Sequence, residues 1–249
     1  SAFFFLFNMF SGTFSQPGKE PLKKTVVFPL VPEYVGYADQ GIEKDTFVGI
    51  PAKCVYYPDN TFKYFIDFDA LETYLEKHRE VGAMCVSRPT NPTGNVLTND
   101  EIRHLSALAY KYNIPLFVDN AYGLPFPNII FTEDAKPYWD SSVILSMSLS
   151  KIGLPSLRTG IVVAKPELIK ALASVNSIVA LASGSLGQVI SQDLFATGKM
   201  KTLAESYVRP FYQQKSLFAQ SCFKEYFAGT NYSVHKSEGA IFNWILMND

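Results

Sequence analysis

Four clusters of side chains that could take part in chemistry follow one another along the middle of the chain. In chain order they are Asn91 before Pro-Thr-Gly, Asp119 with Tyr122, Ser148 and Ser150 with Lys151, and Arg158. An amine can bond to an aldehyde carbon, and a guanidinium with hydroxyls can bind a phosphate. A carboxylate can pair with a protonated ring nitrogen, and an amide and a phenol can bind a ring oxygen. Pyridoxal 5'-phosphate needs all four kinds of group, so the clusters together predict this cofactor.

Lys151 is the candidate for the covalent attachment of that cofactor. It follows the apolar run 143–147 in a turn of small residues and precedes Ile-Gly-Leu-Pro. Lysine is usually a solvated surface residue, but these apolar neighbours disfavour that interpretation here. Once released from the cofactor, the same amine could move a proton to or from the substrate α-carbon as a general acid and base.

Asp119, Tyr122 and Asn91 are the candidates for the cofactor ring. Asp119 closes an apolar strand, where a carboxylate is costly unless it is paired, and a protonated pyridine nitrogen would pair it. Tyr122 and Asn91 could bind the ring oxygen. In an isolated Asp-x-x-Tyr, the Asp would more often cap a turn and the Tyr would pack in the core. Here the pattern lies between Asn91 and Lys151, which favours a cofactor-binding role for both residues. Tyr34 could stack on the ring or pack in the core.

Ser148, Ser150 and Arg158 could converge on the cofactor phosphate. Arg158 taken alone would as readily form a structural salt bridge. A helix that starts near Ser1 could add an anion site, because free amides at a helix N-terminus favour negative charge.

Composition narrows the class of protein. The net charge is −1 over 249 residues, which leaves no basic footprint for nucleic acid or an anionic membrane. Three widely spaced cysteines predict free thiols and a cytoplasmic protein. The three histidines, His78, His104 and His235, have no metal-ligand spacing, so no metal is expected.

Short apolar runs alternate with helical patterns, which predicts an α/β fold with a mostly parallel central sheet and helices on both faces. Two helices are expected at residues 69–78 and 98–112, the second with a Thr98/Glu101 capping box. The candidate strands cover residues 25–30, 46–50, 83–87, 115–119, 143–147 and 159–164. Asn91, Asp119 and Lys151 follow strand ends, where ligands bind in such sheets.

The two ends of the chain suggest two domains. Residues 1–198 would form a large cofactor-binding domain, and residues 199–249 an interdomain helix at 201–227, adjusted near Pro210, and the start of a smaller domain. The apolar run 2–10 reads as a buried helix and 240–246 as a buried strand. Both lack packing partners within the chain, so we expect a fragment of a longer protein that turns over little by itself.

The chain resembles the fold-type I, class I aminotransferases along its whole length. The resemblance is carried by the segments that begin at Ser1, Pro32, Cys85, Val118 and Met147. It implies Lys151 as the Schiff-base lysine, Asp119 at the ring nitrogen, Tyr122 and Asn91 at the ring oxygen, Ser148 and Arg158 at the phosphate, and Tyr34 on the ring face. Within the family, the motifs are similar to those of bacterial enzymes that exchange an amino group between L-valine and pyruvate.

The resemblance also implies a homodimer, amino-acid and 2-oxo-acid substrates, and an arginine for the substrate carboxylate beyond Asp249. Two alternatives stay open. The same clusters would serve another pyridoxal-phosphate reaction, such as a β-elimination of the C–S lyase type. An aminotransferase-like effector-binding domain of a transcription regulator is the third possibility, which residues upstream of Ser1 would decide.

Overall fold

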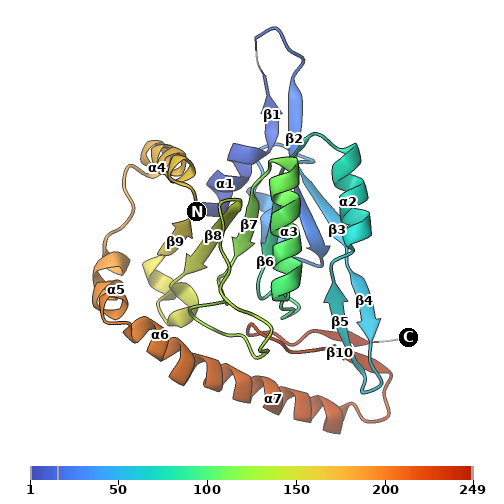
Figure 1. Ribbon diagram of the computed structural model, residues 1–249. Coiled ribbons are helices and arrows are strands. Elements are labelled where there is room, and N and C mark those ends of the chain that lie inside the picture. The colour runs from blue at the N-terminus through green and yellow to red at the C-terminus, as the bar shows by residue number, and fades with distance from the viewer. Residues whose placement is uncertain (1, 16, 248–249) are drawn as a thin grey trace.

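A computed structural model describes residues 2–15 and 17–247, and within them seven strands form a central sheet (Figure 1). The strands are β1 (Gly12–Phe14), β2 (Leu22–Val31), β3 (Phe47–Pro51), β6 (Val81–Ser87), β7 (Leu116–Asp119), β8 (Val143–Ser148) and β9 (Gly160–Val163). Their order is β1-β2-β6-β7-β8-β9, with β3 paired to β2. Strands β3, β2, β6, β7 and β8 are parallel, whereas β1 and β9 are antiparallel to their neighbours. The α/β class and the mostly parallel sheet are confirmed.

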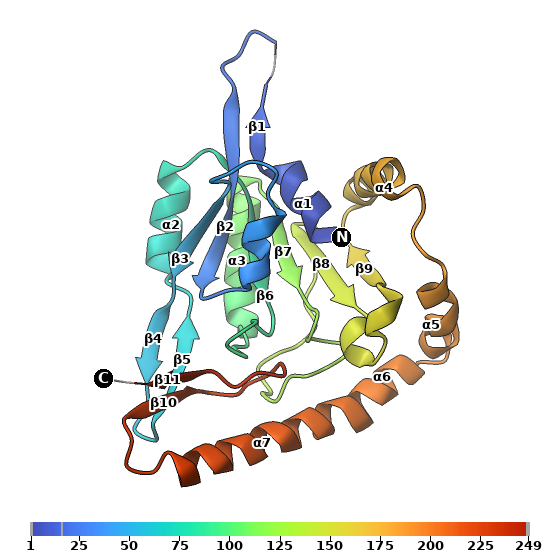
Figure 2. The same cartoon turned by 180° about the vertical axis from the view of Figure 1, so that it is seen from behind.

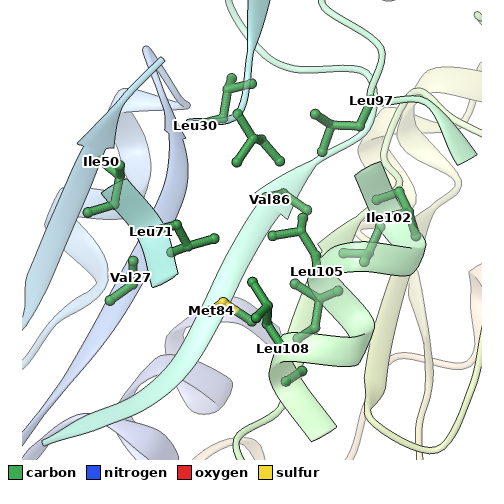
Figure 3. Close-up of a cluster of buried hydrophobic side chains, with 14 of the residues drawn as sticks. Val27, Leu30, Ile50, Leu71, Met84, Val86, Leu97, Ile102, Leu105 and Leu108 are labelled. Atoms are coloured by element: carbon green, nitrogen blue, oxygen red, sulfur yellow. The ribbon is translucent and has the colours of Figure 1, made fainter. Parts of the chain in front are cut away.

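Side chains that alternate along the strands give the sheet two apolar faces. Val27, Met84 and Val86 pack with α2 (Phe68–Lys77) and α3 (Asn99–Tyr112), as Figure 3 shows. Their neighbours face the other way, toward α1 (Ala2–Phe10), where Phe7 has no exposed surface. Figures 1 and 2 show the helices on the two sides of the sheet. The period of two in a strand makes both faces apolar in this way.

The predicted helices at 69–78, 98–112 and 2–10 are confirmed within a residue or two. Thr98 begins α3 with both halves of the capping box, since its hydroxyl accepts from Glu101 N at 3.1 Å and Glu101 Oε2 accepts from Thr98 N at 2.8 Å. These contacts satisfy amides that the first turn leaves free.

Helix dominates from residue 166 to residue 226, and this stretch includes the interdomain helix predicted at 201–227. The segments are α4 (Pro166–Ala180), α5 (Leu186–Ala196), α6 (Lys199–Leu203), the π-helical turn η4 (Ala204–Val208) and α7 (Arg209–Tyr226). The last three run on without a break and form the long helix at the edge of the molecule in Figures 1 and 2. The expected adjustment at Pro210 is this π-helical turn, because Pro210 has no amide to donate to the preceding turn. No helix in the described ranges is long and apolar enough to cross a bilayer.

A second sheet lies beside the first, in the order β11-β10-β5-β4. Its strands are β4 (Lys53–Tyr56), β5 (Thr61–Phe65), β10 (Tyr232–His235) and β11 (Ile245–Met247). The prediction of a buried strand at 240–246 is wrong: the strand begins at Ile245, and Leu246 is 39% exposed because β11 is the edge of this sheet. Since β10 pairs with β5, this sheet includes residues from both sides of the predicted domain boundary at 198, which stays a prediction.

Candidate active site

Asp119 lies at the carboxyl end of β7, at the edge where the other parallel strands also end. Its Oδ2 atom accepts a hydrogen bond from the Tyr37 hydroxyl at 2.6 Å, and its Oδ1 accepts from Ala121 N at 2.9 Å and from the Ser146 hydroxyl at 3.5 Å. Burial raises the pKa of Asp119, and these hydrogen bonds partly oppose that effect by stabilising the carboxylate. The geometry therefore holds an acid that is hydrogen-bonded but is paired with no lysine or arginine among the residues that the structure describes.

Two cavities meet at Asp119. The larger one, of about 420 Å³, is lined by Ser148, Ser150 and Arg158 among others. The smaller one, of about 230 Å³, is lined by Asn91, Tyr122 and Lys151. Tyr34, Tyr37, Asp119 and Ala121 line both. The fold thus gathers eight of the predicted site residues, and the ninth, Ser1, lies outside the described residues.

Lys151 sits in the short 3-10 turn η2 (Ser150–Ile152), directly after β8. Its Nζ atom lies 5.2 Å from the centroid of the Tyr122 ring. Burial and the nearby Asp119 raise the pKa of the Tyr122 phenol to about 12. The phenol therefore stays protonated at neutral pH and can donate a hydrogen bond into the smaller cavity.

Arg158 ends the 3-10 turn η3 (Pro155–Leu157) in a left-handed conformation with φ of 47°. Its Nη1 atom donates to the Pro155 carbonyl at 3.4 Å. It forms no ion pair with a carboxylate of the described residues, so the structural salt bridge considered for Arg158 is not present there. The guanidinium is left available to a ligand in the larger cavity.

Asn91 lies in a turn held by hydrogen bonds from Thr90 N to the Asn95 carbonyl and from Gly94 N to the Thr90 carbonyl, both 2.8 Å long. The Asn91-Pro92 peptide bond is cis. Arg88 precedes this loop, and its buried guanidinium donates to the carbonyl of Leu97, which follows the loop, at 2.7 Å, so it joins the two ends of the loop.

Tyr37 is the site residue that the sequence reasoning missed. It lies in the 3-10 turn η1 (Val35–Gln40), is 3% exposed, and stacks on Phe28 with ring centroids 5.6 Å apart. The Tyr34 ring meets its edge at 5.2 Å. The sequence does contain a signal for Tyr37, because it lies three residues after Tyr34. One turn of a 3-10 helix places residues three apart on the same face, so Tyr37 could have been expected beside Tyr34.

The comparisons with known proteins agree with this geometry. The family model for class I and II aminotransferases matches residues 44–249. The chain belongs to the class I and II aminotransferases. Among curated members of the family, it is 43% identical over all 249 residues to the valine–pyruvate aminotransferase of Escherichia coli K12, and it spans 58% of that protein.

Solved structures of family members match as well. A putative amino-acid aminotransferase from Psychrobacter arcticum 273-4 is 43% identical, with a TM-score of 0.95, and this chain covers 57% of it. The valine–pyruvate aminotransferase of Salmonella typhimurium LT2 is also 43% identical, with a TM-score of 0.87 and 59% of its chain covered. Both matches include 100% of this family member, which spans somewhat under three fifths of each relative.

Proposed function

We propose that this protein binds pyridoxal 5'-phosphate and uses it to exchange an amino group between L-valine and pyruvate, giving 2-oxoisovalerate and L-alanine. The observation that carries the proposal is the set of three charged groups around two adjoining cavities: Lys151, Asp119 and Arg158. The 43% identity to two valine–pyruvate aminotransferases supports the choice of substrates.

The charges of these residues fit the cofactor. Asp119 is paired with no lysine or arginine of residues 2–15 and 17–247, although it is the acid on which the site is built. A protonated pyridine nitrogen would supply the missing counterion. Arg158 with Ser148 and Ser150 would bind the phosphate, the Tyr34 ring would cover the face of the pyridine, and Asn91 and Tyr122 would donate to the ring oxygen.

When bound, pyridoxal phosphate supplies an aldehyde for attachment and an electron-withdrawing ring that acidifies the substrate α-carbon. Asp119 would keep its negative charge and hold the proton on the ring nitrogen. Lys151 would hold the cofactor through its Nζ, and the same amine, when free, would take the proton from the substrate α-carbon. Of the arginines in the described chain, Arg158 is the one that lines either cavity, and the two serines that line the same cavity support its proposed role at the phosphate.

The assignment of Lys151 is tested by trapping. Adding cofactor to the purified protein should produce a new absorbance band, and borohydride should fix the cofactor to one peptide, the one that contains Lys151. Lys151→Ala should lose this adduct, whereas Lys170→Ala, which removes an exposed lysine of α4, should keep it. An undiminished adduct in Lys151→Ala would refute the role.

The reaction is tested by product analysis. We expect 2-oxoisovalerate and L-alanine from L-valine and pyruvate, and no pyruvate released from cysteine-type substrates. Release of pyruvate from those substrates without transamination would favour the β-elimination alternative.

We also propose that two copies of the protein associate and that it works in the cytoplasm. The large apolar side chains exposed on α4 and α5 support the first proposal. Cys54, Cys85 and Cys222 are free thiols, which fits a reducing compartment.

A further inference from the structure

A second carboxylate lies close to Asp119 and has no part in the proposed chemistry. Glu33 follows β2, and its Oε2 atom accepts a hydrogen bond from Ser87 N at 2.9 Å. Its Oε1 atom contacts the Ser87 hydroxyl and accepts from Tyr34 N at 2.9 Å. Glu33 therefore connects the backbone of Tyr34 to the end of β6.

Both residues that Glu33 connects, Ser87 and Tyr34, lie at the candidate site. Ser87 is the register partner of Asp119 across β6 and β7 and lines the smaller cavity. Tyr34 lines both cavities, and Tyr37, three residues further on, donates to Asp119. The segment 33–37 is thus attached to the strand edge at two points, once through Glu33 and once through Tyr37.

The charged and titratable groups that face Glu33 disfavour a second negative charge. Asp119 on β7, the Cys85 thiol on β6 and the Tyr37 phenol on η1 lie around it, and no lysine or arginine of the described residues pairs with it. Burial raises the pKa of Glu33 to about 7, the Asp119 charge adds to this, and the hydrogen bonds from Ser87 and Tyr34 oppose it.

Glu43 provides an internal comparison. Its carboxylate accepts from Thr13 N and from the Thr13 hydroxyl, both at 2.8 Å, which is the same pair of donors that Ser87 offers to Glu33. Glu43 is exposed, and there these hydrogen bonds lower the pKa. The different behaviour of Glu33 therefore comes from its surroundings and not from the hydrogen-bond pattern.

We propose that Glu33 is a positioning residue that works in its protonated form. Its proton lies between Oε1 and the Ser87 hydroxyl, its two oxygens accept from the amides of Tyr34 and Ser87 and so hold Tyr34 in place, and Asp119 remains the ionised carboxyl of the pair. The Ser87 hydroxyl can accept this proton in a hydrogen bond because its own hydrogen is free to rotate. The assignment of Tyr34 to the ring face is taken from the proposed function.

The first test needs no cofactor. Infrared difference spectra of the protein, taken about one pH unit below and above 7, should contain the carbonyl band of a protonated carboxylic acid that disappears as the pH rises. Glu33→Gln should abolish this band, and the control Glu43→Gln should retain it. A band that persists in Glu33→Gln, or is absent from the unchanged protein, would overturn the proposal.

The second test uses bound pyridoxal phosphate and its induced circular dichroism, which reports how the ring is held. Glutamine has no proton to lose near neutral pH, so Glu33→Gln should still bind cofactor but lose the pH dependence of the dichroism near neutrality. Glu33→Ala should weaken cofactor binding about tenfold because the connection to Tyr34 is gone. Equal pH dependence in Glu33→Gln and Glu43→Gln, or equal affinity of Glu33→Ala and the unchanged protein, would contradict the role. Failure of the unchanged protein to bind any cofactor would instead refute the proposed function, and the infrared result would still decide the state of Glu33.

Discussion

At the scale of single residues, the site depends on acids kept in surroundings that disfavour their charge. Asp119 has three hydrogen-bond donors and no lysine or arginine partner among the described residues, so its carboxylate is prepared for a positively charged ligand. Glu33, close by, also has three donors, the amide and hydroxyl of Ser87 and the amide of Tyr34, and it too is paired with no lysine or arginine of that part of the chain. Two neighbouring carboxyls without a cation disfavour two negative charges, which is why we propose that Asp119 keeps the charge and Glu33 the proton.

Asp119→Asn tests the charge at this point. The amide keeps the shape and can still hydrogen-bond, so cofactor should stay bound, but it cannot hold a proton on the ring nitrogen. We expect removal of the substrate α-proton to slow by at least about 100-fold, comparable to the loss of one preorganised electrostatic contact. Single-turnover mixing with L-valine measures this step, and a near-normal rate would show that Asp119 has another role.

At the scale of elements, loops after parallel strands carry the site, and close backbone packing fixes them. The turn that carries Asn91 touches the segment that follows β10. A Cβ added to Gly94 would lie 2.7 Å from the Gly239 carbonyl oxygen, and Gly94 has φ of +71°. Nearby, the Phe242 ring meets the edge of the Tyr122 ring with centroids 5.6 Å apart. Residues near position 240 therefore hold two of the loops that line the smaller cavity.

Gly94→Ala should move this turn, and Gly18→Ala is its matched control. Gly18 has φ of +77° with nothing within 4 Å of an added Cβ, so its substitution incurs the backbone penalty of about 1 kcal/mol alone. Gly94→Ala adds the clash with Gly239, so it should lower the free energy of unfolding by more and weaken cofactor binding. Urea midpoints and cofactor titrations of the two variants measure this. If both variants lowered the free energy of unfolding and the cofactor affinity equally, the backbone near Gly239 would be able to move away from the added methyl group without cost.

At the scale of the whole molecule, apolar surface is distributed unevenly. The helices α2 and α3 bury their apolar stripes against the sheet, whereas α4 has no buried residue and exposes Ile178 at 84% and Val179 at 65%. Helix α5 also exposes Val189 at 65%. Exposed apolar side chains on consecutive helices are typical of an interaction surface, which supports the proposed association of two copies.

Ile178→Glu tests the proposed association of two copies through that surface. A buried, unpaired carboxylate at an interface is costly, so the variant should sediment as a monomer at concentrations where the unchanged protein is a dimer. Tyr56→Glu is the control, because Tyr56 is 56% exposed on β4, which lies on the opposite side of the molecule from α4 and α5 in Figures 1 and 2. Loss of the dimer in both variants, or in neither, would count against this surface.

The dependence of stability on pH is also a property of the whole molecule. The pKa of Glu33 rises from 4.5 to about 7 on folding, so the folded state binds more protons between these values. Its contribution is fully present below pH 4.5 and is lost as the pH rises through 7, up to about 3 kcal/mol by linkage. Relative to the unchanged protein, Glu33→Gln should therefore gain stability from about pH 5 to pH 7.

Urea unfolding at the two pH values measures this difference. Glu43→Gln is the control with the opposite sign, because the pKa of Glu43 is lowered and its contribution is lost only as the pH falls below 4.5. If the free energy of unfolding changed by the same amount between the two pH values in Glu33→Gln and in the unchanged protein, Glu33 would be ionised in the folded state.

The sequence by itself determined the class of fold and the place of the candidate site residues at strand ends. Thr98 and Glu101 could be paired because a capping box is local, and Lys151, Asp119 and Asn91 could be placed because each follows a strand of recognisable pattern. Only the tertiary structure decided which groups surround them. The hydrogen bond from Tyr37 to Asp119 joins residues 82 apart, and that from Ser87 to Glu33 joins residues 54 apart. The exposure of β11 likewise depends on its being the edge of a sheet. Spacing along the chain determines contacts within one helical turn or one strand. Contacts between strands depend on the pairing register and on the order in which the chain connects the strands, and the packing of the whole sheet sets both.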